Sequence, residues 1–180
     1  MIMRKVLYIF GLLTDADIGW LGMNGSCRRI RSGEVLIQEG KQTDSLILLL
    51  EGEVQVSARG HGDIARMSVG EIMGEVSLVD SAPPSATIAV VADGMALFID
   101  KTLLLDKLDQ DEGFAARFYR ALAIFLADRL RATRQPTTDR LIDLAGISRD
   151  ELDMGIMERV ADAGERFNRL LHALGVQQGG

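Results

Sequence analysis

One short stretch of the sequence combines residue types that could bind a small anionic ligand. Gly74 would let the backbone approach a ligand closely, and Glu75 places a carboxylate at the start of a short helical turn. The N–H groups of that turn, around Val76, Ser77 and Leu78, could hold an anion. The carboxylate of Glu75 could accept hydrogen bonds from a pair of sugar hydroxyls. The stretch therefore predicts recognition of a ribose together with a phosphate.

A second stretch, Pro83-Pro84-Ser85-Ala86-Thr87-Ile88, follows shortly after. The glycine, the glutamate, the short apolar turn and then a proline before Ala-Thr-Ile together resemble the phosphate-binding cassette of cyclic-nucleotide-binding domains. Gly33, Gly40 and Gly52 also stand where that catabolite-activator-like family has glycines in its strand turns. The resemblance covers roughly residues 10 to 134. It implies a regulatory module without a cofactor, for which cyclic AMP (cAMP) and cyclic GMP (cGMP) are the candidate ligands.

The second stretch departs from the family at one position. The family has an arginine directly after the proline, where it pairs with the cyclic phosphate, and this chain has Pro84 there. Proline has neither a charge nor a backbone N–H, so both contacts that this position could make are lost. Losing one partner of a buried, charge-assisted pair costs about 2 to 5 kcal/mol. Ser85, which stands where the family often has a donor to the phosphate, and Thr87 remain as polar groups.

Other basic residues could supply the missing charge, and Arg66, Arg131 and Arg134 are candidates. The stretch 129–134 resembles the region that contacts the base in catabolite-activator relatives, with Thr133 at the matching position. Two simpler interpretations stay open, in which Glu75 only caps its own turn and Thr133 only faces solvent. The predicted ligand-binding residues are Gly74, Glu75, Val76, Ser77, Pro84, Ser85, Thr87 and Thr133.

The elements that must position these residues are strands separated by glycine turns, from about residue 26 to residue 99. Residues 46–50 are continuously apolar, like a strand covered on both faces, and residues 54–57 alternate like a half-buried strand. Thr14 and the acidic residues after it predict the start of a helix. We expect a mainly β fold with α elements, an antiparallel β-roll or jelly-roll-like barrel flanked by an N-terminal helix and C-terminal helices. Further strands are predicted at 29–31, 35–38, 64–67, 86–91 and 95–99.

Helical periodicity follows after Asp100, with a short helix at 103–108 and a long one from about Glu112. The apolar stripe of the long helix must be covered by the strands, by the same helix of a second subunit, or by both, and we expect a homodimer through it. Pro136 interrupts the helical pattern. The predicted division is therefore 1–134, a cyclic-nucleotide-binding-like β-roll with its long helix, and 135–180, a helical extension.

The charges argue against nucleic acid as a partner. The net charge of -6 repels a phosphate backbone. Transcription regulators of the family carry a helix-turn-helix after the long helix, but residues 149–163, which would form its recognition helix here, carry five acidic side chains against two basic ones. We therefore find no convincing helix-turn-helix, and DNA binding is not expected.

Catalysis and a membrane location are not predicted either. His61 and His172 have no second histidine at metal-ligand spacing, and no nearby serine or cysteine completes a hydrolytic set, so we expect neither a metal site nor an enzyme. The apolar run of residues 6–13 is too short to span a bilayer. The single cysteine, Cys27, suits a reducing compartment, and a cytoplasmic protein without a membrane partner is expected.

Three functions follow from these observations, in decreasing order of support. The first is a sensor that binds a cyclic nucleotide or a related anionic metabolite and signals through the C-terminal helices. The second is a degenerate domain that keeps the fold without the ligand and acts as a dimeric protein-interaction module. The third is a transcription regulator.

Overall fold

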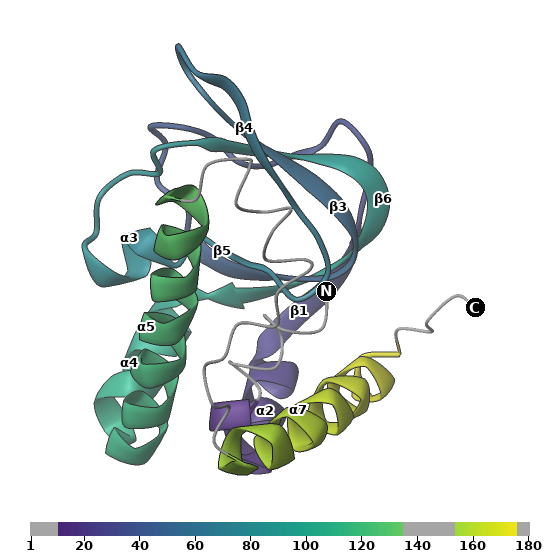
Figure 1. The fold of residues 1–180 in the computed structure, drawn as a ribbon, viewed down its shortest axis with the longest axis vertical. Helices are drawn as coiled ribbons and strands as arrows, with labels where there is room; N and C mark the ends of the chain where they lie inside the picture. Colours follow the sequence, from purple (N-terminus) through teal and green to yellow (C-terminus); the bar gives the residue numbers. More distant parts are fainter. Residues whose placement is uncertain (1–10, 135–153, 176–180) are drawn as a thin grey trace.

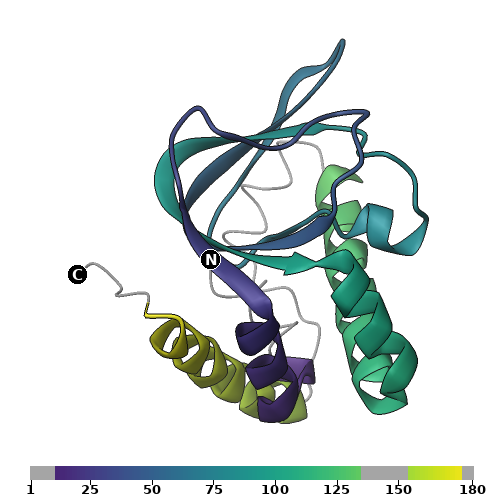
Figure 2. The same ribbon diagram turned by 180° about the vertical axis from the view of Figure 1, so that it is seen from behind.

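The computed structural model describes residues 11–134 and 154–175, in which a twisted antiparallel sheet is flanked by helices (Figures 1 and 2). Helix α7 follows the undescribed internal stretch, residues 135–153. The elements in chain order are α2 (Asp15–Asn24), β1 (Gly25–Ile30), β2 (Val35–Ile37), β3 (Ser45–Ala58), β4 (Gly62–Met67), β5 (Ile72–Met73), α3 (Val76–Val79), β6 (Thr87–Asp100), α4 (Lys101–Gln110), α5 (Glu112–Arg134) and α7 (Met154–Ala173).

The sheet confirms the predicted β-roll with flanking helices. Its strands run in the order β1-β6-β3-β4, with β2 paired to β6 and β5 paired to β3, and every pairing is antiparallel. The described strands do not close into a barrel, so of the two predicted forms the open roll is the correct one.

Two long strands replace four predicted short ones. Strands β3 and β6 pair from Ser45 opposite Asp100 to Ser57 opposite Thr87, with register shifts between residues 49 and 54. The predicted strands at 46–50 and 54–57 are thus parts of β3, and those at 86–91 and 95–99 are parts of β6. The separate-strand prediction was wrong because Gly52 marks a bulge inside a strand and not a turn. Gly52 has a φ of +94°, and a Cβ there would lie 2.7 Å from the carbonyl oxygen of Ala92.

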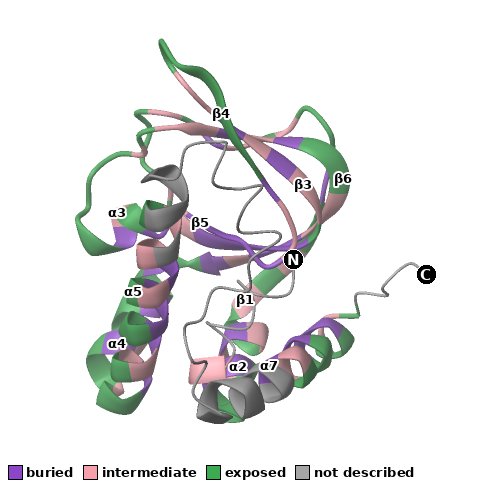
Figure 3. Cartoon of the chain, viewed as in Figure 1, coloured by how far each residue is buried: buried purple, intermediate pink, exposed green. Residues whose placement is uncertain are grey.

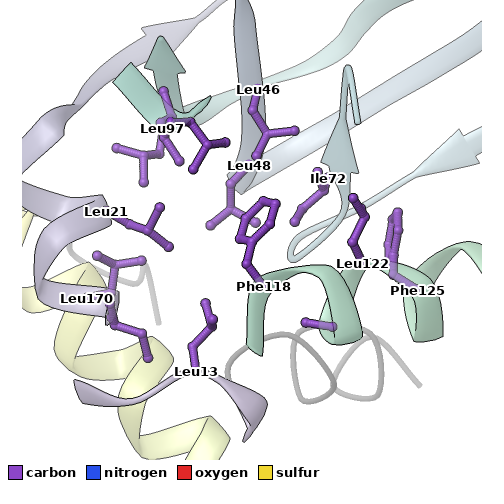
Figure 4. Close-up of a cluster of buried hydrophobic side chains, with 14 of the residues drawn as sticks. Leu13, Leu21, Leu46, Leu48, Ile72, Leu97, Phe118, Leu122, Phe125 and Leu170 are labelled. Atoms are coloured by element: carbon purple, nitrogen blue, oxygen red, sulfur yellow. The ribbon is translucent and has the colours of Figure 1, made fainter. Parts of the chain in front are cut away.

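Residues 46–50 are buried on both faces of β3, as their continuous apolar character predicted. Leu46 and Leu48 pack in a core cluster between the sheet and the helices (Figure 4). Leu50 belongs to the same cluster. Ile47 and Leu49 point to the opposite face, into a second cluster inside the roll. The strand period of two therefore divides one apolar run between two cores.

The helices begin and cover the sheet largely as predicted. Thr14 is the N-cap of α2, where it forms a capping box with Asp17. The apolar stripe of α5 is buried within this chain, and its members in the core cluster are Phe114, Phe118, Ala121, Leu122 and Phe125 (Figure 3). Because the strands and neighbouring helices of the same chain cover this stripe, the homodimer stays a prediction.

Helix α7 packs against α2 at the end of the molecule away from β4 (Figures 1 and 2). Its buried residues Phe167, Leu170 and Leu171 join the same cluster as Leu13. The described part of the C-terminal extension therefore packs on the domain. The predicted boundary after residue 134 coincides with the start of an undescribed segment and stays a prediction. In the parts of the chain that the structure describes, no helix is long and apolar enough to cross a membrane.

Candidate functional site

The predicted ligand-binding turn lies where the chain leaves the sheet after β5. Met73 is fully buried, and the next residue, Gly74, has a φ of +83°. A Cβ at Gly74 would lie 2.8 Å from the carbonyl oxygen of Ser45, so glycine is needed both for the conformation and for the close approach to β3. The chain then turns at once into α3, as the sequence predicted.

Glu75 stands at the N-cap of α3, but its carboxylate serves another element. The side chain makes no capping hydrogen bond to α3, which contradicts the interpretation that Glu75 only caps its own turn. Instead, Nη1 of Arg129, which is 54 residues further along the chain on α5, donates a hydrogen bond to Oε1 of Glu75. Glu75 is only 2% exposed, so this ion pair is largely removed from water on its acidic side.

The charges around Glu75 act in opposite directions. Burial raises the pKa of Glu75 because the charged carboxylate loses its hydration, and the nearby carboxylate of Glu71 adds to this effect. The positive charges of Arg129 and Lys101 lower the pKa but do not cancel the shift, so the pKa of Glu75 lies above its usual value. Glu71 is itself buried, and the turn therefore brings two acids and two cations close together.

Lys101 is the second cation. It is the first residue of α4, and its side chain reaches Ser77 of α3. It is 8% exposed, and its Nζ donates to the carbonyl oxygen of Thr43 at 2.9 Å and to Oγ of Ser77 at 2.6 Å. Burial lowers the pKa of Lys101, opposed by the charges of Asp44 and Glu75. Ser77 also donates its own hydroxyl proton to the carbonyl oxygen of Gly74 at 3.3 Å. Lys101 thus fixes α3 against the start of α4.

The second predicted stretch contacts the turn that follows β2. The carbonyl oxygen of Pro84 accepts a hydrogen bond from the N–H of Gly40 at 2.8 Å, and Oγ1 of Thr87 accepts one from the N–H of Glu39 at 3.1 Å. Ser85 is exposed. Pro84 and Thr87 therefore hold this loop in place, and their predicted roles as ligand contacts stay predictions.

The cations next to the acid are not the ones that the sequence suggested. Arg66 lies on β4 and pairs with Glu53 at 2.9 Å, with two thirds of its side chain exposed. The side chains of Arg131, Thr133 and Arg134 lie outside the described residues, although their backbones belong to α5. Sequence reasoning missed Arg129 and Lys101 as partners of the turn. Arg129 belongs to the basic stretch 129–134, but no local sequence pattern indicates that it reaches Glu75.

Among residues 11–134 and 154–175, no group of three or more histidine, cysteine, aspartate or glutamate side chains could hold a metal ion. What the turn offers is a buried acceptor, adjacent helix-start N–H groups and two cations, which together could recognise a ligand with hydroxyls and a negative charge.

Comparison with known proteins shows which family part of this chain resembles. Residues 27–111 match the cyclic nucleotide-binding domain. A cGMP-dependent protein kinase of Caenorhabditis briggsae is 32% identical over 75 residues, which are 42% of this chain and 10% of the kinase. The chain thus spans about a tenth of the length of that relative.

Solved structures share the fold. A cyclic nucleotide-binding domain from Methylobacillus flagellatus has a TM-score of 0.62 at 23% identity, covering 84% of this chain and 86% of that one. The catabolite activator protein of Thermus thermophilus has a TM-score of 0.55 at 24% identity, covering 93% of this chain and 88% of that one. At this level of sequence identity the similarity shows a shared fold only.

Proposed function

We propose that this chain is a regulatory module that binds a cyclic nucleotide, or a related anionic metabolite, at the α3 turn, because residues 27–111 match the cyclic nucleotide-binding domain. The observation that carries the proposal is the burial of Glu75 beside α3 without a capping bond to that helix. A buried carboxylate is costly even when it is paired, and the partner of Glu75 comes from α5 and not from its own turn, which supports a role in binding.

Each residue of the turn has a proposed part in binding. Glu75 accepts hydrogen bonds from the ribose hydroxyls, and Gly74 lets the phosphate approach the backbone. The N–H groups of Val76 and Ser77, which lie at the start of α3 where no helical carbonyl precedes them, donate to the phosphate. Arg129 and Lys101 supply positive charge near the turn in place of the arginine that Pro84 replaces. Ser85, Thr87 and Thr133 are proposed as further contacts.

Binding would act on the rest of the molecule through the helices. The turn touches α5 through Arg129 and α4 through Lys101, so a ligand that binds one arrangement of these helices better than another shifts the population toward it. We also propose that this happens in the cytoplasm. The named cGMP dependence of the kinase relative makes cGMP the first ligand to test, with cAMP beside it.

Calorimetric titration with cGMP and with cAMP tests the proposal. We expect binding by the wild-type chain and a loss of about tenfold or more in affinity in Glu75→Gln, because the amide is a weaker acceptor for the ribose hydroxyls. Glu53→Gln is the matched control, since it makes the same substitution at an exposed ion pair on β3. Equal affinities of the Glu75→Gln and Glu53→Gln variants would reject a ligand role for Glu75.

A second candidate function is a ligand-free interaction module that keeps the fold. It is favoured by Pro84, which lacks the charge and the N–H for phosphate, and by the ion pair that already engages Glu75. This candidate predicts no heat with either nucleotide at millimolar concentration. It also predicts a dimer in light scattering across a concentration series of the intact chain, and a monomeric mass at every concentration would argue against it.

A further inference from the structure

One face of helix α2 presents apolar residues to solvent. Ala16, Gly19, Trp20 and Met23 recur at the three- and four-residue spacing that places them on the same face of a helix, and we call them the α2 stripe. Ala16 and Gly19 are exposed, Trp20 is half-buried, and Met23 is 82% exposed. Figure 2 shows α2 (purple) with α7 on one side and α4 and α5 on the other. The stripe therefore lies on a part of the surface that is bordered by helices.

The neighbouring face of α2 shows what a glycine does in this helix. Gly22 faces α7, and a Cβ there would lie 3.1 Å from Cδ1 of Leu170, so the glycine lets a large side chain of another helix approach closely. A Cβ at Gly19 would meet no atom of the described residues within 4 Å. A glycine inside a helix is destabilising relative to alanine. Packing within the chain offsets this cost at Gly22, whereas nothing in the described residues offsets it at Gly19.

Trp20 supplies a fixed aromatic side chain next to this open position. Its ring centroid lies 5.7 Å from that of Phe114 and 5.9 Å from Nζ of Lys107, so contacts from α5 and α4 hold the ring in place. An aromatic side chain that is already held loses little conformational freedom when a partner binds, and tryptophan is enriched among the residues that dominate binding energy in interfaces. The stripe thus combines two large side chains, Trp20 and Met23, with two small residues.

We propose that the α2 stripe binds the α2 stripe of a second copy of this chain, with the two helices antiparallel about a two-fold axis that passes between residues 19 and 20. In this arrangement Met23 of one copy lies against Ala16 of the other and Trp20 lies against Gly19, and the symmetry repeats both contacts. Each large side chain then meets a small residue, as Leu170 meets Gly22 within the chain. The inference goes beyond the proposed function and does not depend on it, because the stripe belongs to α2 and not to the α3 turn.

The size of the contact sets the affinity to expect. Helix α2 has 10 residues, so two copies of it bury less than the roughly 1,200 Å² of a stable interface, and we expect a reversible dimer with a Kd of about 10 to 100 µM. Sedimentation equilibrium of the intact chain from about 1 µM to about 1 mM should show the mass rising from that of a monomer toward that of a dimer. A monomeric mass throughout this range overturns the proposal and would favour a helix of another protein as the occupant.

Two matched pairs of variants test the position of the contact. Met23→Gln should raise the Kd of the dimer about tenfold or more, whereas Ile64→Gln, which replaces a hydrophobic residue that is 54% exposed on β4, should leave it unchanged. Gly19→Leu should also raise the Kd about tenfold or more, because the new side chain occupies the space of the partner's Trp20. Gly164→Leu is its control, since a Cβ at this glycine of α7 also meets no atom of the described residues within 4 Å. Equal Kd values within either pair overturn the proposal.

A second readout comes from fluorescence. Trp20 is the single tryptophan of the chain, so its emission reports on the α2 stripe alone. As the protein concentration rises, the emission should shift to shorter wavelength, because the exposed part of the ring leaves water, and the midpoint of the shift should match that of the mass. A rise in mass without this shift would show a dimer through another surface, such as α5, and would overturn the proposal.

Discussion

Two arginines of helix α5 form ion pairs with buried carboxylates, Arg117 with Asp17 and Arg129 with Glu75. The two pairs differ in how many hydrogen bonds the carboxylate accepts. Near the start of the helix, Arg117 donates from Nε and Nη2 to the two oxygens of Asp17, at 2.7 and 2.9 Å. Asp17 also accepts from the N–H of Thr14 at 2.7 Å. Near the end of the helix, Arg129 donates to Glu75 through Nη1, and Glu75 makes no capping bond to α3.

The pKa values of the two acids follow this difference. Burial acts to raise the pKa of Asp17, but the hydrogen bonds from Arg117 and Thr14 outweigh it, so the pKa lies below its usual value. Burial dominates at Glu75, and its pKa lies above its usual value despite Arg129. A carboxylate with several fixed donors stabilises the fold, whereas one whose charged form is still costly gains from a further donor. The comparison therefore supports a structural role for Asp17 and the proposed binding role for Glu75.

The largest expected effect is the loss of stability in Asp17→Ala. This variant removes one partner of a buried bidentate pair and half of the capping box of α2, and we expect the free energy of unfolding to fall by about 3 kcal/mol or more. Urea unfolding measures it. Asp15→Ala is the control, because Asp15 lies in the same turn with its side chain 64% exposed and should cost about 1 kcal/mol or less. Equal losses in the two variants would remove the structural role of Asp17.

Replacing each of the two arginines by lysine should lower the free energy of unfolding by different amounts, because the two ion pairs differ in geometry. Arg117→Lys cannot reproduce two hydrogen bonds from one planar group, so we expect a loss of about 1 to 2 kcal/mol in the free energy of unfolding. Arg129→Lys keeps one charge and one donor for Glu75, and its loss should be smaller, about 0.5 kcal/mol. Thermal or urea unfolding of both variants decides the order, and the reverse order would contradict the comparison.

The pH dependence of stability should have opposite signs for the two acids. Because the folded-state pKa of Asp17 is lowered, its contribution is complete above the unfolded-state value of about 3.9 and is lost as the pH falls through the folded-state pKa. Because the folded-state pKa of Glu75 is raised, its contribution is complete below the unfolded-state value of about 4.3 and is lost as the pH rises through the folded-state pKa.

Urea unfolding of the wild type, Asp17→Asn and Glu75→Gln over a pH series measures these contributions. The stability difference between the wild type and Asp17→Asn should increase with pH in the acidic range. The difference between the wild type and Glu75→Gln should decrease as the pH rises above about 4.3. Differences of the same sign would show that the two acids are in equivalent environments.

The same comparison explains how much the sequence could predict. Local signals located most of the strands, the cap at Thr14 and the turn at Gly74 and Glu75, because alternation, a capping residue and a turn glycine are properties of neighbouring residues. The two-residue strand β5 was not predicted. Arg117 and Asp17 are 100 residues apart, and Arg129 and Glu75 are 54 apart. Such pairs depend on how α5 packs against the rest of the chain, which no local pattern specifies.

The lack of a long-range signal also explains why the two long strands, β3 and β6, were predicted as four short ones. Gly52 in β3 was interpreted as a turn between strands, and only the backbone of β6 opposite it shows that the position is a bulge inside one strand. A glycine signals that the backbone needs freedom or close approach, but a turn and a bulge need it alike. The number of strands was therefore predicted less well than their positions.

The smallest expected effect concerns a third set of charges, which joins α7 to α2. Arg169 contacts Asp15 at 3.3 Å, and both side chains are about 60% exposed (60% and 64%), so Arg169→Ala should change the free energy of unfolding by less than about 0.5 kcal/mol. Leu170→Ala is the informative partner, because this neighbour is 3% exposed against α2 and should cost about 2 to 3 kcal/mol. If urea unfolding found Arg169→Ala as costly as Leu170→Ala, exposed charges would hold α7 as firmly as packing does. The distinction between exposed and buried pairs, on which the contrast between Asp17 and Glu75 is built, would then fail for this protein.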